Sequence, residues 1–269
     1  MDTRSGKQIR LGRILDPDTG KGIVVACSHA VFAGPVEGLH SASEAERVMA
    51  ALVGADGLLI SPGWVERLTP VFRGKNRPAL ILHMDWKSSE RNFLPVADTL
   101  LCPLFTVEQA VASGADAVMT YLYYGQSDAQ QEREEIQRNA EVARACERWG
   151  MVHIIEPRSA SEQQCPESVA PAVLAAYARI GAELGGMIIK TIYPGSSEGL
   201  GEVVEASPVP VLVAGGPGGS SPDDVLQLSA NILAAGASGL VFGRKIFQSE
   251  DPAGLLAKLR RVVHGDTIL

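Results

Sequence analysis

The sequence predicts an α/β fold, a (β/α)8 or TIM barrel formed as a single domain over residues 1–269. Short apolar runs recur along the chain, and most of them are nearly continuous, as in parallel strands covered on both faces. Longer amphipathic stretches separate these runs, and the length of 269 residues is close to the roughly 250 that one barrel needs. The alternative is an open doubly wound sheet, which the absence of a Gly-x-Gly-x-x-Gly motif after the first run disfavours.

The apolar runs give eight expected strands. In chain order they cover residues 23–27, 57–60, 79–83, 117–121, 152–155, 187–190, 209–214 and 239–242. The main expected helices cover residues 43–52, 130–149, 168–184, 222–235 and 251–263. Pro222 is followed by two aspartates, which favours a helix start there. Gly54, Gly114 and Gly236 follow helical stretches, where glycine suits a left-handed helix cap.

Composition excludes several classes of function. The net charge is −7 and no block of Lys and Arg occurs, so we expect no nucleic-acid partner. No apolar stretch reaches the ~18 residues of a membrane span, and the N-terminus lacks an apolar signal region. We therefore expect a cytoplasmic protein without a membrane partner. The four cysteines lack metal-binding spacing and are expected to be free thiols: Cys27, Cys102, Cys146 and Cys165.

Lys190 ends an apolar strand, and TIM barrels carry their chemistry at the carboxyl ends of strands. Burial disfavours the ammonium form of a lysine, and the neutral amine is a nucleophile toward a carbonyl carbon. Position alone leaves a second interpretation open, in which Lys190 reaches solvent or pairs with a barrel carboxylate such as Glu156.

Two glycine-rich loops form a candidate phosphate site. They are Gly215–Ser220 after the seventh expected strand and Gly243-Arg244 after the eighth, where many barrels bind phosphate. Glycine lets backbone amides approach the anion, and the guanidinium of Arg244 adds donors. The alternative is a pair of tight turns that need glycine for backbone geometry.

Proton transfer has two candidates. Glu156 follows the fifth expected strand and could move protons beside an imine, or could simply pair with Lys190 or Arg158. His29 could also exchange protons near neutral pH, although a structural histidine is commoner. His83 and His153 fit core positions. The possible metal ligands are scattered, so we expect neither a metal nor another cofactor.

Residues 188–216 and 236–252 resemble the archaeal-type class I fructose-bisphosphate aldolase family, and the similarity extends from about Leu11 to the last helix. Related enzymes include an acyl transferase acting on the phosphorylated autoinducer-2 product and synthases that join dihydroxyacetone-phosphate-type donors to aspartate semialdehyde. The resemblance implies a Schiff base at Lys190 and a homo-oligomer. It also implies a substrate phosphate at Gly215, Gly216, Gly243 and Arg244.

The chain departs from this family at two positions. The family usually has Asp-His-Gly after the first strand, where this sequence has Ser28-His29-Ala30. Aldolases of the family commonly end the fifth strand with Tyr-Pro-Arg-Gly, and Glu156 stands at the position of that tyrosine. The acidic function thus moves from the first strand to the fifth, which suggests a specialised rather than a glycolytic substrate. Trp86, where relatives carry a small residue, narrows the expected pocket.

The resulting hypothesis is a lysine-imine aldolase-type lyase acting on a phosphorylated carbonyl substrate. Its expected catalytic residues are Lys190, Glu156, His29 and Ser28. Further expected substrate contacts, from neighbouring strand ends, are Arg158, Asp85, Lys87 and Tyr193. Two alternatives remain: a thiolase-like acyl transferase that uses the same lysine, and a non-catalytic barrel that binds phosphosugars.

Overall fold

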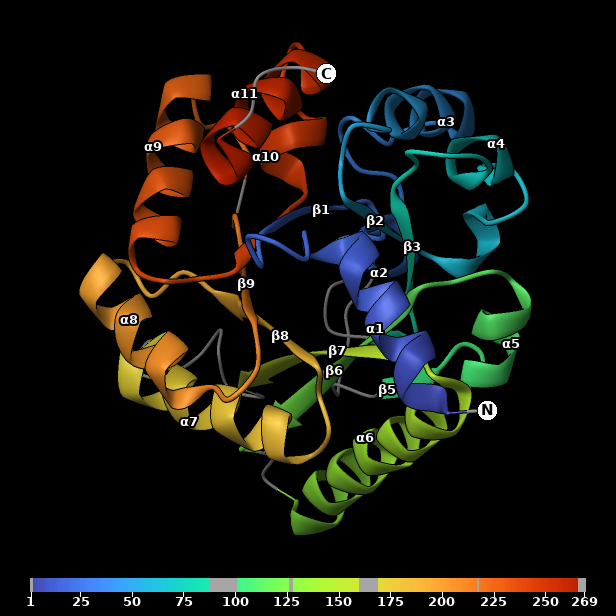
Figure 1. Ribbon diagram of the computed structural model, residues 1–269, viewed down its shortest axis with the longest axis vertical. Coiled ribbons are helices and arrows are strands. Elements are labelled where there is room, and N and C mark those ends of the chain that lie inside the picture. The colour runs from blue at the N-terminus through green and yellow to red at the C-terminus, as the bar shows by residue number, and fades with distance from the viewer. Residues whose placement is uncertain (1, 88–100, 126–127, 160–168, 217, 266–269) are drawn as a thin grey trace.

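The computed structural model describes residues 2–87, 101–125, 128–159, 169–216 and 218–265. Within these residues, eight parallel strands close into a barrel (Figure 1). The strands are β1 (Gly22–Ala26), β2 (Gly57–Ile60), β3 (Ala79–His83), β6 (Ala117–Tyr124), β7 (Val152–Ser159), β8 (Ile188–Ile192), β9 (Val211–Ala214) and β10 (Gly239–Phe242). Around the barrel they follow the order β1-β10-β9-β8-β7-β6-β3-β2. The predicted (β/α)8 barrel is confirmed.

Strands β6 and β7 run further than the sequence predicts. Their parallel pairing continues from Ala117 opposite Val152 to Tyr124 opposite Ser159. Glu156 and Arg158 therefore lie inside a strand rather than in the loop after it. Because side chains alternate along a strand, these two residues point to the same face of the sheet.

Helices form an outer layer around the strands (Figure 1). The longer ones are α3 (Ala42–Ala51), α6 (Ala129–Trp149), α7 (Pro171–Glu183), α8 (Ser197–Ala206), α9 (Pro222–Ala234) and α11 (Pro252–His264). Shorter helices are α2 (Ala30–Ala33), α4 (Thr69–Phe72), α5 (Val107–Ala112) and α10 (Arg244–Phe247). Helix α8 was not predicted from the sequence. Of the three predicted left-handed glycines, Gly114 and Gly236 have φ of 79° and 92°, whereas Gly54 does not have a positive φ.

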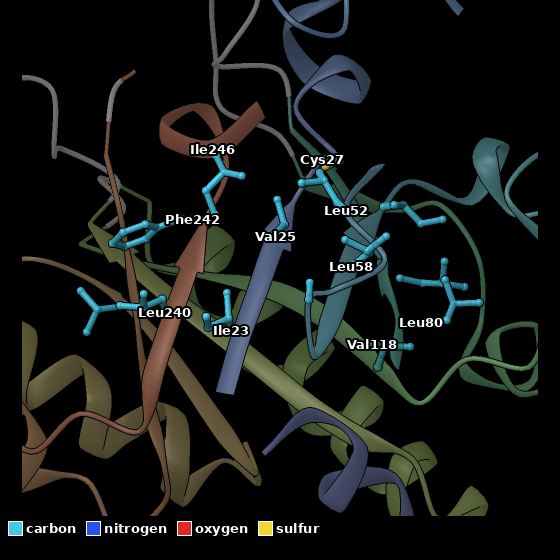
Figure 2. Packing of buried hydrophobic residues seen from close by; sticks show 14 of the residues in the cluster. Ile23, Val25, Cys27, Leu52, Leu58, Leu80, Val118, Leu240, Phe242 and Ile246 are labelled. Carbon is cyan, nitrogen blue, oxygen red and sulfur yellow. The ribbon is translucent and has the colours of Figure 1, made fainter. Parts of the chain in front are cut away.

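Each strand separates two apolar layers. The outward side chains pack under the helices, and Figure 2 shows this for Ile23 and Val25 of β1 beside Leu58 of β2 and Phe242 of β10. The inward side chains fill the lower barrel in a separate cluster, which includes Val24, Leu59, Ile81, Met119, Ile154, Ile188, Leu212 and Val241. This alternation decides which later residues on each strand face the barrel interior.

Helix α1 (Thr3–Ile14) closes the amino-terminal end of the barrel. It lies across the strands in the view of Figure 1 and contacts β1, β3, β7 and α6. Ile14 and Leu15 join the inward apolar cluster. A β-carbon at Gly22 would come 2.2 Å from the carbonyl oxygen of Ile14, so this close approach requires glycine. The lower end of the barrel is therefore filled.

A small antiparallel sheet extends beyond β3. It consists of β4 (Asp85–Lys87) and β5 (Leu101–Pro103). Partly buried Trp86 of β4 packs against a cluster of Phe32, Tyr121 and Tyr123. Among the described residues, no helix has the length and apolar character that crossing a membrane requires.

Candidate active site

A polar layer lies above the apolar filling of the barrel. Inward positions two residues further along the strands carry Ser28 after β1, His83 in β3, Tyr121 in β6, Glu156 in β7 and Lys190 in β8. All five are buried, with exposed fractions of 8% or less. Side chains alternate between the two faces of a strand. The alternation that places aliphatic side chains inside the lower barrel therefore also brings these five polar groups together at one site.

A cavity of about 690 Å³ opens at this polar layer. Ten of the twelve residues predicted for the site line it: Ser28, His29, Glu156, Arg158, Lys190, Tyr193, Gly215, Gly216, Gly243 and Arg244. The other lining residues were not predicted as site residues, and they include Phe32, His83 and Tyr121. Two of them could have been predicted from the alternation of side chains along a strand, because His83 and Tyr121 follow inward-facing Ile81 and Met119 by two residues.

Lys190 and Glu156 form an ion pair on adjacent strands. The Lys190 ammonium donates to Oε2 of Glu156 at 2.6 Å, and Nη1 of Arg158 donates to Oε1 of the same carboxylate at 3.0 Å. Glu156 is 2% exposed, while the side chains of Lys190 and Arg158 are 10% and 21% exposed. One buried carboxylate thus holds two cations at the cavity wall. Their mutual attraction offsets part of the free-energy cost of removing the three charges from water.

This arrangement can activate the amine. Attack on a carbonyl requires the neutral form of Lys190, and the carboxylate at hydrogen-bond distance can accept the departing proton. Arg158 holds the second carboxylate oxygen and so fixes the direction of the first. The structure shows the pairing of Lys190 with Glu156, and the same carboxylate lies where it could accept the proton of the amine.

Glycines in the loops after β9 and β10 lie at close approaches or in a left-handed conformation. A β-carbon at Gly243 would come 2.7 Å from the carbonyl oxygen of Ala26, and one at Gly215 would come 2.8 Å from Cδ1 of Phe242. Gly216 has a φ of 73°. Beside them, the Lys245 ammonium donates to Oγ of Ser220 at 2.6 Å. Burial lowers the pKa of this lysine, which was not among the predicted site residues.

His29 lies against the loop after β10. Its ring makes an edge contact with Phe247, with centroids 5.3 Å apart. A β-carbon at Gly243 would come 2.5 Å from Cε1 of His29, so ring and loop are in close contact. His29 is therefore positioned at the candidate phosphate loops.

Asp85 was expected to contact substrate, and the structure corrects this. Its side chain is fully buried and does not line the cavity. The carboxylate accepts hydrogen bonds from Nη1 of Arg138 at 2.6 Å and from the backbone N–H of Tyr121 at 2.6 Å. Arg138 also binds Glu135 and the carbonyl oxygen of Tyr121. Asp85 thus fastens β4 to β6 and α6. The sequence could not show that the chain turns into a small sheet here. The side chain of Lys87 lies outside the described residues.

Other predicted positions are structural. His153 lies on the outward face of β7, where its Nε2 contacts Oγ1 of Thr120 at 2.8 Å. Cys27 and Cys146 are buried free thiols and Cys102 is exposed, while Cys165 lies outside the described residues. Within the described part of the chain, no group of three or more His, Cys, Asp or Glu side chains could hold a metal ion.

A buried lysine–carboxylate pair in the mouth of a closed barrel is an arrangement that could form an imine with a carbonyl substrate. Residues 23–249 match the model of the DeoC/LacD family of aldolases. The chain belongs to this family and is an enzyme of the aldolase type.

Two relatives and one solved structure narrow the comparison. The 2-amino-3,7-dideoxy-D-threo-hept-6-ulosonate synthase of Halobacterium salinarum is 33% identical, over 98% of this chain and 94% of that protein. The 2-amino-4,5-dihydroxy-6-oxo-7-(phosphonooxy)heptanoate synthase of Streptomyces griseus is 30% identical, over 96% and 90%. An archaeal fructose-1,6-bisphosphate aldolase, with its catalytic lysine bound to a carbinolamine intermediate, superposes with a TM-score of 0.80 at 25% identity, over 96% of this chain and all of that one.

Proposed function

We propose that the protein makes or breaks a carbon–carbon bond in a phosphorylated ketose-like substrate through an imine at Lys190. The observation that carries this proposal is the 2.6 Å contact between the Lys190 amine and the Glu156 carboxylate inside the cavity. It supplies a nucleophile and an adjacent proton acceptor at one wall of a substrate-sized space.

The proposed first step is imine formation. Glu156 takes a proton from the Lys190 ammonium, and the free amine adds to the substrate carbonyl carbon. A proton then moves from the nitrogen to the oxygen and gives the neutral carbinolamine. Glu156 returns its own proton to the carbinolamine hydroxyl, which leaves as water and gives the protonated imine. Arg158 stays on Oε1 of Glu156 throughout and keeps Oε2 directed at the nitrogen.

The second step is carbon–carbon chemistry. The protonated imine accepts the electron pair of the breaking bond and becomes a neutral enamine, while the hydroxyl of the departing fragment loses its proton and becomes a carbonyl. Condensation is the reverse. The glycine loops and Arg244 are proposed to hold the substrate phosphate, because their amides and guanidinium offer donors at the cavity edge.

A specialised substrate fits the chain better than a glycolytic one. The two heptulosonate-type synthases are 33% and 30% identical to the chain, above the 25% of the fructose-bisphosphate aldolase structure. Ser28 and Glu156 also replace the aspartate and tyrosine usual in the aldolases that the sequence resembles. Condensation of a phosphorylated ketone donor with a second, polar aldehyde is therefore the favoured reaction.

Borohydride trapping tests the proposal. The wild-type enzyme is mixed with a panel of phosphorylated ketoses, reduced and analysed by peptide mass, and the expected result is an adduct on Lys190 together with an aldehyde product. Lys190→Met should lose both, and Lys258→Met, which changes an exposed lysine of α11, should keep both.

Three outcomes would overturn it. A product that requires coenzyme A would indicate acyl transfer through the same lysine. Tight ligand binding without turnover, unchanged in Lys190→Met, would indicate a non-catalytic barrel. Turnover that persists in Lys190→Met without any adduct would exclude the imine.

A further inference from the structure

A second pair of polar side chains faces the cavity away from Lys190. Oγ of Ser28 and Nδ1 of His83 lie 2.9 Å apart, and both residues line the cavity. Ser28 follows β1 and His83 ends β3, so their contact spans β2, which lies between those strands in the barrel. Lys190 and Glu156 come from β8 and β7, on the other side of β6. The cavity thus has two separate groups capable of proton transfer.

Aromatic rings hold His83 in one orientation. The ring of Phe32 meets it edge-on with centroids 4.8 Å apart, and the ring of Tyr121 lies tilted at 5.1 Å. His83 is 1% exposed and Ser28 is 4% exposed. With its proton on Nε2, the neutral imidazole presents Nδ1 as an acceptor for the Ser28 hydroxyl. The nearby face of Tyr121 can also stabilise a positive charge on the ring.

An aldol reaction needs proton transfer at two places. One is the imine nitrogen, and the other is the hydroxyl oxygen on the second carbon from the imine carbon. Glu156 is occupied at the first place, since its two oxygens bind Lys190 and Arg158. A substrate extending from Lys190 across the cavity would bring its hydroxyl toward the wall that carries Ser28 and His83.

We propose that Ser28 and His83 form the proton relay for the carbon–carbon step. This inference rests on the proposed imine chemistry and assigns its second proton transfer. In cleavage, the substrate hydroxyl gives its proton to Oγ of Ser28 while the Ser28 proton passes to Nδ1 of His83. The carbon–carbon electron pair moves into the protonated imine, which becomes a neutral enamine. The positive charge passes from the imine to His83, so charge and protons balance. In condensation each transfer runs backwards.

The relay makes a prediction that separates the two steps. Ser28→Ala and His83→Asn should still form the borohydride-trapped adduct on Lys190 at near wild-type yield. Their kcat for carbon–carbon turnover should fall by about 10²- to 10⁴-fold, the usual contribution of a positioned acid or base, with little change in KM. Ser28 touches the substrate in this scheme, and His83 acts through it.

His153→Asn is the matched control. His153 is equally buried and also contacts a hydroxyl, Oγ1 of Thr120, but it faces the helices rather than the cavity. Any general cost of losing a buried histidine should appear in its melting temperature without a comparable fall in kcat. If His83→Asn does not fold, Ser28→Ala carries the test, since it removes one oxygen atom.

Wild-type kcat in both Ser28→Ala and His83→Asn would overturn the relay. A parallel loss of adduct and turnover would also overturn it, because the pair would then be needed to build the imine site. The proposed function fails separately, if the wild-type enzyme gives no adduct on Lys190.

Discussion

Both ends of the barrel hold carboxylates that are buried or partly buried, but these carboxylates have different partners. At the amino-terminal end, Asp116 accepts from the backbone N–H of Leu80 at 2.9 Å and from Arg13 at 2.8 Å. Asp56 accepts from the N–H of Ile23 at 2.7 Å and also binds Arg260 and His264. At the carboxyl-terminal end, Glu156 binds Lys190 and Arg158 at the wall of a cavity.

The contrast shows that burial of a charge alone does not mark a catalytic site. Asp56 and Asp116 both end a Gly-Ala-Asp sequence and each fastens a neighbouring strand, so this repeated sequence is a structural device. Asp85 does the same near the mouth by accepting the N–H of Tyr121. Glu156, to which we assign the chemical role, differs from them because it shares a cavity with a primary amine.

The largest expected effect is at Lys190. Lys190→Met should lower kcat/KM by about a thousandfold or more, since the covalent intermediate cannot form. Its free energy of unfolding should stay near the wild-type value, because Glu156 keeps Arg158 as a partner. Steady-state kinetics beside urea denaturation checks both parts. A large loss of stability with activity retained would contradict a catalytic role of Lys190 and would indicate that its pairing with Glu156 is structural.

The next largest effect is expected for the stability of the protein at acid pH, and it arises on the outward face of β7. Burial lowers the pKa of outward-facing His153 to about 3, so the native state resists a proton that the unfolded chain accepts near pH 6.5. The stability that this neutral histidine contributes is therefore lost as the pH falls from about 6.5 toward 3.

His153→Gln should reduce this acid sensitivity. Relative to wild type, the variant should gain about 3 kcal/mol between pH 7 and pH 4, measured by urea denaturation at each pH. Equal pH dependence in the two proteins would contradict the prediction.

A smaller effect is expected at the amino-terminal end. Asp116→Asn weakens the contact with Arg13 and should cost about 2 kcal/mol of unfolding free energy, less than a fully buried pair because Arg13 is half-exposed. The kcat should not change. Thermal unfolding and kinetics on the same preparation test this, and a fall in kcat at unchanged stability would link this end to the chemistry.

The smallest effect is expected at the candidate phosphate loops. Gly243→Ala places a methyl group against the Ala26 carbonyl and His29, so the loop must shift. The KM for a phosphorylated substrate should rise about tenfold, which corresponds to roughly 1.4 kcal/mol of binding. The matched control is Gly63→Ala, where an added β-carbon meets nothing within 4 Å. A KM that does not change would contradict a role of this loop in binding.

The sequence predicted most of the mouth because strand ends and glycine loops follow simple rules. Lys190, Glu156 and the loop glycines end apolar runs, and parallel strands bring those ends together. Asp85 was placed wrongly because the same rule cannot show where the chain turns away after the strand. His83 and Tyr121 were not predicted because the alternation of inward and outward side chains was not followed beyond the apolar residues of β3 and β6.

Helix α1 was missed for a different reason. Its sequence is polar and contains Gly6 and Gly12, which weakens the helical pattern. Gly6 lies against Gly150 after α6, where an added β-carbon would come 3.6 Å from a backbone oxygen. Helix α1 thus depends on contacts with the barrel and α6 that local propensity does not report.

Helix α1 and the apolar layers above it leave the mouth as the route by which molecules reach Lys190. In a condensation of two substrates, the partner that forms the imine must then enter first, and the second would block its exit. Such an enzyme should show ordered kinetics: the donor binds alone, the acceptor binds only to the loaded enzyme, and acceptor analogues inhibit uncompetitively against the donor.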